Sequence, residues 1–211
     1  MCNRARFAGE PETLHERFGG GWLTDRPRDN TFNPQELRPN KRAYVIREEA
    51  GERGVDVMNW DVLGGQAKWF MTNVRNLALP QWARLAERPE NRCLVPLTEF
   101  AEFTPERHDL GDGKKPLKGE MWFSVMDQPV FAVAGFWQRT AAGDGFAMVT
   151  CDANELVEPI HPKAMITIVH EGDWTTWLRG GLDEVRALQR PYPAAAMTMR
   201  GPVFPTRGRD A

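Results

Sequence analysis

The second residue of the chain carries the most reactive chemistry in the sequence. The chain begins Met1-Cys2, and Cys2 is small enough for an aminopeptidase to remove the methionine before it. Cys2 would then carry a thiol and an α-amine on adjacent carbons, with ordinary pKa values of about 8.5 and about 8. The amine can act as a base for its own thiol in acyl transfer, or condense with an aldehyde to an imine that the thiol closes to a thiazolidine ring. A Cys at a frayed chain end is also an ordinary occurrence, so its meaning depends on its partners.

Three further positions along the chain could serve such a nucleophile, and the first has an arginine beside it. The amide of Asn73 could hold an amine or orient a carbonyl, and Arg75 could face a phosphate, although a loop Asn is usually a turn or cap residue. Glu102 shares one face of a predicted strand with Phe100. Its carboxyl then lies at a solvated edge, the commoner case, or in a desolvated pocket that raises its pKa and suits acid–base catalysis. His161 stands on a turn before a predicted strand, where a lone His is more often structural than catalytic.

Composition narrows the class of protein. The 211 residues are 41% hydrophobic and include 8 Trp, enough for the core of one large domain or two small ones. No apolar run approaches the roughly 18 residues of a membrane span, and the N-terminus lacks the apolar h-region of a signal peptide, which predicts a cytoplasmic protein without a membrane partner. Three cysteines without a CxxC pair predict neither a disulfide framework nor a metal site, and no cofactor motif is present. The net charge of −2 gives no overall attraction to nucleic acid.

Short strands and short helices alternate along the whole chain. Apolar alternation predicts strands over 43–46, 55–60, 92–95, 99–103, 121–126, 130–137, 146–150 and 164–169. Helices are expected over 11–18, 80–88, 174–179 and 182–190, with loops at 24–40 and 106–118. Because no stretch resembles a linker, we predict a single α+β domain over 1–211, built on a curved, mostly antiparallel sheet or open barrel. The Pro- and Arg-rich tail 191–211 is expected to be loosely held.

Several short motifs occur in a distinctive order. They are Met1-Cys2-Asn3-Arg4, Val57-Met58-Asn59-Trp60-Asp61, Asn73-Val74-Arg75, Arg92-Cys93-Leu94-Val95-Pro96, Phe100-Ala101-Glu102-Phe103 and Ile160-His161. Together they resemble the SOS response-associated peptidase (SRAP) family over about four fifths of the chain. The resemblance implies a monomeric α+β domain that binds single-stranded DNA containing abasic sites, in the cytoplasm and on the nucleoid during DNA damage.

The resemblance also implies roles for the four chemical residues. Cys2 would capture the ring-opened aldehyde of an abasic site as a thiazolidine DNA–protein crosslink, after autocatalytic, peptidase-type removal of the residue before it. Asn73 would position the α-amine, and Glu102 would move protons during imine formation and ring closure. His161 would help to open the sugar and promote reversal or strand cleavage, a lyase activity.

The resemblance to the family further implies that three residues bind the DNA. Arg4 and Arg75 would hold phosphates, and Trp69 would stack on bases.

The sequence departs from the family pattern at several points. Asn3 stands where the family usually has Gly, Ala101 replaces an aromatic residue, and the turn after His161 reads Pro162-Lys163-Ala164-Met165 in place of the usual His-x-Arg-Met. Two alternatives therefore stay open. One is an N-terminal-nucleophile cysteine amidohydrolase, like the glutamine amidotransferases that also begin Met-Cys, and the other is a DNA-binding module that has lost the chemistry.

Overall fold

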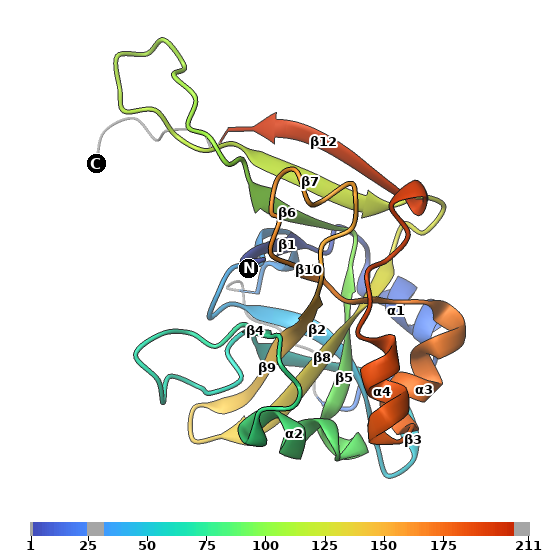
Figure 1. Cartoon of the computed structure of the whole chain (residues 1–211). Coiled ribbons are helices and arrows are strands. Elements are labelled where there is room, and N and C mark those ends of the chain that lie inside the picture. Colours follow the sequence, from blue (N-terminus) through green and yellow to red (C-terminus); the bar gives the residue numbers. More distant parts are fainter. Residues whose placement is uncertain (1, 25–31, 205–211) are drawn as a thin grey trace.

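Five long strands close into a small barrel at the centre of the molecule (Figure 1). The computed structural model describes residues 2–24 and 32–204. The barrel strands are β2 (Arg42–Glu49), β3 (Glu52–Asn59), β5 (Arg92–Leu97), β8 (Phe131–Thr140) and β9 (Gly143–Cys151). Neighbours pair antiparallel except β3 and β9, which are parallel and meet at Asn59 and Gly145. A Cβ on Gly145 would lie 2.2 Å from the carbonyl oxygen of Asp61, so only glycine lets the ring close here.

A second, smaller sheet lies against the barrel. It contains β1 (Arg4–Arg6), β6 (Glu99–Phe103), β7 (Glu120–Val125) and β12 (Met197–Val203), in the order β1-β6-β7-β12. One apolar core joins the small sheet to the barrel. It holds the stacked rings of Phe100 and Phe123, 5.1 Å apart, and the parallel rings of Trp60 and Phe146, 6.3 Å apart. The side chain of Cys2 is part of the same core.

Four short helices cover the outside of the barrel. They are α1 (Pro11–Phe18), α2 (Pro80–Ala86), α3 (Trp174–Arg179) and α4 (Leu182–Leu188). Side chains of the barrel strands point alternately into two apolar cores. Val45 lies in the core shared with the small sheet, and Tyr44 and Ile46 lie in a second core beneath the helices. In Figure 1, α1, α3 and α4 gather along one side and α2 lies at one end of the barrel. None of the described helices is long and apolar enough to cross a membrane.

The predicted α+β fold with a curved sheet is confirmed. The prediction allowed an open barrel, and the barrel in the structure is closed. The helix predicted over 11–18 matches α1 at both ends. The strand predicted over 164–169 is instead two strands, β10 (Met165–Ile166) and β11 (Ile168–Val169), which pair with β9 and β8 respectively. Within the described residues there are also four 3-10 helices: η1 (Pro34–Glu36), η2 (Pro89–Asn91), η3 (Glu171–Asp173) and η4 (Ala194–Ala196).

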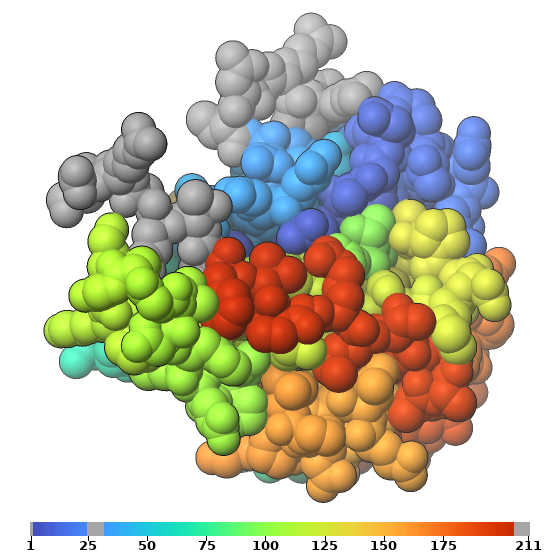
Figure 2. Space-filling view, turned by 90° about the horizontal axis from the view of Figure 1, so that it is seen from above, coloured from blue at the N-terminus to red at the C-terminus, as the bar shows by residue number. Residues whose placement is uncertain are grey.

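Three strands escaped prediction. β1 and β4 (Asn73–Val74) have only three and two residues, too few to show an alternating pattern. The third, β12, contains Gly201-Pro202 and lies in the tail that was expected to be loosely held. That expectation is wrong for 197–203, which pair with β7 and occupy the middle of the face in Figure 2. The remainder of the tail, 205–211, and residues 25–31 of the predicted loop lie outside the described residues.

The predicted excursion between β6 and β7 is an arm that projects from the small sheet (Figure 1). A bridge between His108 and Leu117 closes it, and the side chain of His108 packs edge-on against Phe204. Thr104 holds its base, since its hydroxyl donates to Glu106 O over 2.8 Å and accepts from Gly119 N over 3.0 Å.

Candidate active site around Cys2

Cys2 lies at the edge of the small sheet, directly before β1. β1 pairs with β6 through Arg4 and Ala101, Ala5 and Phe100, and Arg6 and Glu99. The Cys2 side chain is only 1% exposed, and its thiol donates to the carbonyl oxygens of Arg4, at 3.3 Å, and Ala101, at 3.9 Å. Burial, followed by the nearby carboxyl of Glu102, raises the pKa of the Cys2 thiol far above its ordinary value. The thiol is therefore protonated at neutral pH in this arrangement.

Asn73 reaches Cys2 from the barrel. It begins β4, a two-residue strand that runs parallel to β9. The preceding carbonyl, that of Thr72, fixes this segment because it accepts from the Trp60 indole N–H and from Met148 N, each over 2.9 Å. The Asn73 side chain then donates from Nδ2 to the carbonyl oxygen of Cys2 over 2.9 Å. Residues 2 and 73 are thus brought into direct contact.

Glu102 lies on the inner face of β6. It pairs with Met121 of β7 and shares its face with Phe100, as alternation predicts. Only 4% of Glu102 is exposed, and burial raises the pKa of its carboxyl to about 7. Of the two environments considered for Glu102, the side chain occupies the desolvated one. Both protonation states of this carboxyl are accessible near neutral pH.

Two buried oxygen atoms of this cluster have no hydrogen-bond partner among the described residues. They are Oδ1 of Asn73 and Oε1 of Glu102. An unsatisfied buried acceptor costs about 1–3 kcal/mol, so native structures seldom leave one without a reason. Both atoms belong to residues that interact with Cys2, one through a hydrogen bond and the other through its charge. The arrangement is suited to receiving a nitrogen that carries several hydrogens.

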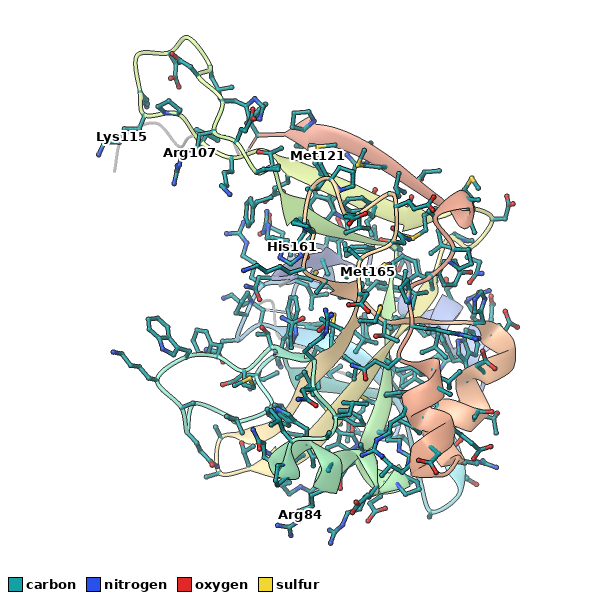
Figure 3. All side chains as sticks on the ribbon, in the orientation of Figure 1. Arg84, Arg107, Lys115, Met121, His161 and Met165 are labelled. Carbon is teal, nitrogen blue, oxygen red and sulfur yellow. The ribbon has the colours of Figure 1, made fainter. Side chains whose placement is uncertain are left out.

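His161 lies on the turn before β10 (Figure 3). Its Nδ1 is 2.7 Å from the carbonyl oxygen of Ala164. A carbonyl only accepts, so Nδ1 carries the proton and Nε2 is the basic nitrogen of the neutral ring. Burial lowers the pKa of His161, which keeps the imidazole neutral at pH 7.

The two arginines predicted to hold phosphates both have protein partners. Nε of Arg4 forms an ion pair with Glu120 at 2.7 Å. The guanidinium of Arg75 donates to the carbonyl oxygens of Cys151, at 2.7 Å, and Lys163, at 2.8 Å, and also bonds the carboxylate of Asp152. Arg75 therefore ties β4 to the turn that carries His161.

Trp69 lies on the loop between β3 and β4. The carboxylate of Asp61 anchors this loop by accepting from the backbone N–H groups of Leu63 (3.3 Å), Gly65 (2.8 Å) and Met71 (2.9 Å). At its tip Trp69 is 75% exposed and Phe70 52% exposed. Trp69, to which the family resemblance assigns base stacking, therefore lies at the surface beside a second exposed aromatic residue.

No pattern in the sequence pointed to Thr72, and Asn3 stood out only as a departure from the family pattern. The structure places both beside Asn73, because the Thr72 hydroxyl is 2.9 Å from Asn73 Nδ2 and 2.9 Å from Asn3 Oδ1. A Thr next to an Asn in an irregular stretch has no recognisable spacing, and these contacts depend on the long-range docking of β1.

The raised pKa of Glu102 predicts a pH-dependent effect on stability. The neutral carboxyl is favoured in the folded state, so its contribution is complete below the unfolded value of about 4.5 and is lost as the pH rises through about 7. Glu102→Gln is always neutral, so it should unfold at a higher temperature than the unsubstituted protein at pH 8. The expected advantage is on the order of 2 kcal/mol, or several degrees in Tm. Thermal unfolding at pH 5 and pH 8 tests this, and an equal difference at both would contradict it.

Comparison with known proteins assigns the chain to a family. The model of the family described as SOS response associated peptidase (SRAP) matches residues 1–203. No curated protein matches the chain.

Three crystal structures share the fold. A protein from Bacteroides thetaiotaomicron superposes with a TM-score of 0.75 at 20% identity, over 97% of this chain and 97% of that one. A protein from Bordetella bronchiseptica gives a TM-score of 0.72 at 21% identity, over 94% and 98%. A phage-related protein from the same organism gives 0.70 at 16% identity, over 94% and 93%. With a family model that spans nearly its whole length, the chain belongs to the SOS response associated peptidase family.

Proposed function

We propose that the protein captures ring-opened abasic sites in single-stranded DNA through Cys2, once Met1 has been removed. The observation that carries this proposal is the pair of buried acceptors, Asn73 Oδ1 and Glu102 Oε1, in the residues that interact with Cys2. Removal of Met1 creates an α-ammonium group on Cys2. The ammonium group has three N–H donors, and Asn73 Oδ1 and Glu102 Oε1 are two acceptors without a donor. Hydrogen bonds between them would remove the free-energy cost of burying unsatisfied acceptors, which the unprocessed chain bears.

The chemistry needs no oxidant or reductant. The α-amine of Cys2 adds to the aldehyde carbon of the abasic sugar, and the resulting hydroxyl leaves as water when it takes a proton from the neutral carboxyl of Glu102. This step forms the C=N bond of an imine. The nitrogen keeps its hydrogen, so the imine is protonated, and the Cys2 sulfur then adds to the same carbon while the Glu102 carboxylate takes the thiol proton and becomes neutral again. One C–S bond forms, C=N becomes C–N, and one water is released in all.

A carboxyl with a pKa of about 7 suits both steps. Its acid form donates to the leaving hydroxyl, and its carboxylate form accepts the thiol proton, so the same group can act twice within one reaction. The buried thiol, whose pKa is raised, needs such a base.

The family name implies a peptidase, and we assign that activity to hydrolysis of the Met1–Cys2 bond, with Cys2 as nucleophile. Met1 lies outside the described residues. Neutral His161 is assigned to opening the sugar ring and to reversal of the adduct.

DNA would lie across the seam between the two sheets. The exposed Trp69 and Phe70 offer stacking surfaces for unpaired bases, and stacking is worth about 1–3 kcal/mol per base. Lys68, 5.5 Å from the Trp69 ring, adds a positive charge at the same loop tip. For Arg4 and Arg75 a phosphate contact would have to add to, or replace, the protein contacts that each already makes.

The test uses protein whose mass establishes that Met1 is absent. It is mixed with a single-stranded oligonucleotide that contains one abasic site, boiled in detergent and separated on a denaturing gel. A boil-stable band is expected from the unsubstituted protein and none from Cys2→Ala. An oligonucleotide with a tetrahydrofuran site, which has no aldehyde, is the matched control and should give no band. If protein without Met1 forms no band, the proposal fails, and the amidohydrolase and binding-module alternatives take precedence.

A further inference from the structure

Three hydrogen bonds connect the side chain of Asn3 to the main chain of Cys2 through the barrel. Thr72 Oγ1 lies 2.9 Å from Asn3 Oδ1, Asn73 Nδ2 lies 2.9 Å from Thr72 Oγ1, and the same Nδ2 lies 2.9 Å from the carbonyl oxygen of Cys2. The path therefore leaves the N-terminal segment at Asn3, crosses to the strand β4, and returns to the N-terminal segment at Cys2.

The direction of each hydrogen bond follows from the atoms involved. The carbonyl oxygen of Cys2 can only accept, so the Asn73 atom that faces it must be the NH2 group. The second hydrogen of that group goes to Thr72 Oγ1, whose own hydrogen then goes to Asn3 Oδ1. Both hydrogens of Asn73 Nδ2 are thus used.

This pattern leaves one orientation for the Asn73 carboxamide. Rotating it by half a turn would place Oδ1 against the carbonyl of Cys2, two acceptors facing each other, and would break the bond to Thr72 as well. The observed orientation leaves Oδ1 buried and without a donor among the residues that the structure describes. The backbone beneath is also held, since the Thr72 carbonyl accepts from Trp60 and Met148.

We propose that Asn3 and Thr72 are positioning residues that lock the Asn73 carboxamide with Oδ1 available to the α-amine of Cys2. This inference rests on the proposed function, in which that amine attacks the aldehyde. The relay depends on the side chain of Asn3, so a glycine at this position would remove it. Without it, Asn73 keeps its bond to Cys2 but loses the second constraint on its torsion angle, and the amine loses a fixed acceptor.

Thr72→Val tests the relay because valine has the shape of threonine and lacks the hydroxyl. The rate of imine formation is measured alone in a Cys2→Ser background lacking Met1, by borohydride trapping at saturating abasic DNA. Thr72→Val and Asn3→Ala should each slow trapping about tenfold, while Thr72→Ser, which keeps the hydroxyl, should restore the rate. The double variant Asn3→Ala/Thr72→Val should be no slower than the slower single variant, because both remove one relay. DNA affinity should stay within about twofold.

Thr104→Val is the matched control. It also removes a buried threonine hydroxyl with two hydrogen bonds, but at the base of the arm. It should lower Tm by a similar amount, because it loses as many hydrogen bonds, and leave the trapping rate unchanged. A Thr72→Val protein that traps as fast as its background, or a Thr104→Val protein that is slowed equally, would overturn the relay.

A second readout works without any reaction with DNA. In nuclear magnetic resonance spectra both side-chain amide hydrogens of Asn73 should exchange slowly with water, and Thr72→Val should expose one of them. If no imine forms in any variant but this exchange behaves as expected, the relay stands and the proposed reaction fails. If both hydrogens stay protected in Thr72→Val, the relay is wrong whatever the reaction does.

Discussion

Replacing Cys2 by serine is expected to stop the proposed reaction halfway. Cys2→Ser keeps the α-amine once Met1 is gone, so it should still form an imine with an abasic oligonucleotide that borohydride traps. It should form no boil-stable adduct, because a hydroxyl is a far weaker nucleophile than a thiol and its ring product reopens readily. The loss of stable adduct should be complete on a denaturing gel, as it is for Cys2→Ala.

The pattern across three proteins is what identifies the mechanism. The unsubstituted protein should give a stable band with or without borohydride, Cys2→Ser a band only with it, and a chain that retains Met1 neither. A boil-stable adduct from Cys2→Ser would show that the sulfur is not part of the linkage. The Cys2→Ser side chain should remain buried at the edge of the small sheet, so DNA affinity is the control for correct folding.

Glu102→Gln should slow crosslinking by about a hundredfold or more at neutral pH, because glutamine can neither donate to the leaving hydroxyl nor accept the thiol proton. The pH dependence carries a further signature. Above a pKa of about 7 the acid form of Glu102 is depleted and dehydration slows, while below it the carboxylate is depleted and ring closure slows. The unsubstituted protein should therefore show a rate maximum near neutral pH that Glu102→Gln lacks.

Glu99→Gln is the matched control for this variant. Glu99 lies on the same strand as Glu102 but on its outer face, where it pairs with Arg6 and Arg200. Its substitution should leave both the crosslinking rate at saturating DNA and the pH maximum in place. Equal slowing in the two variants would mean that Glu102 acts through the fold of the small sheet, and an unchanged rate in Glu102→Gln would remove it from the mechanism.

Local chemistry explains which parts of the molecule could be predicted from the sequence. The long barrel strands show a clear alternation of apolar residues, and α1 begins at a proline and ends before glycines. The positions of these elements could therefore be predicted from the sequence. The shared face of Phe100 and Glu102 follows from the period of a strand. Burial of Glu102 did not follow, because it depends on how β6 docks against the barrel.

The missing parts depend on contacts between distant segments. β1, β4 and β12 have weak patterns of their own and exist because a neighbour supplies hydrogen bonds. The same is true of Thr72 and Asn3, which meet only when β1 and β4 are both in place. The sequence indicated that Arg75 carries a positive charge near the site. It could not reveal that the Arg75 guanidinium already donates hydrogen bonds to carbonyl oxygens of the protein.

The pairing of β1 with β6 determines when the N-terminus can dock as the chain emerges from the ribosome. Arg4 pairs with Ala101, so this contact cannot form until Ala101 has been synthesised and has left the exit tunnel. At ordinary elongation rates that delay is on the order of ten seconds. During it the first residues of the nascent chain are accessible to an aminopeptidase, whereas afterwards Cys2 is buried against β6. If the proposed function is right, folding would separate two routes to the free amine: an external enzyme would act before β1 docks, and the site's own chemistry would act after.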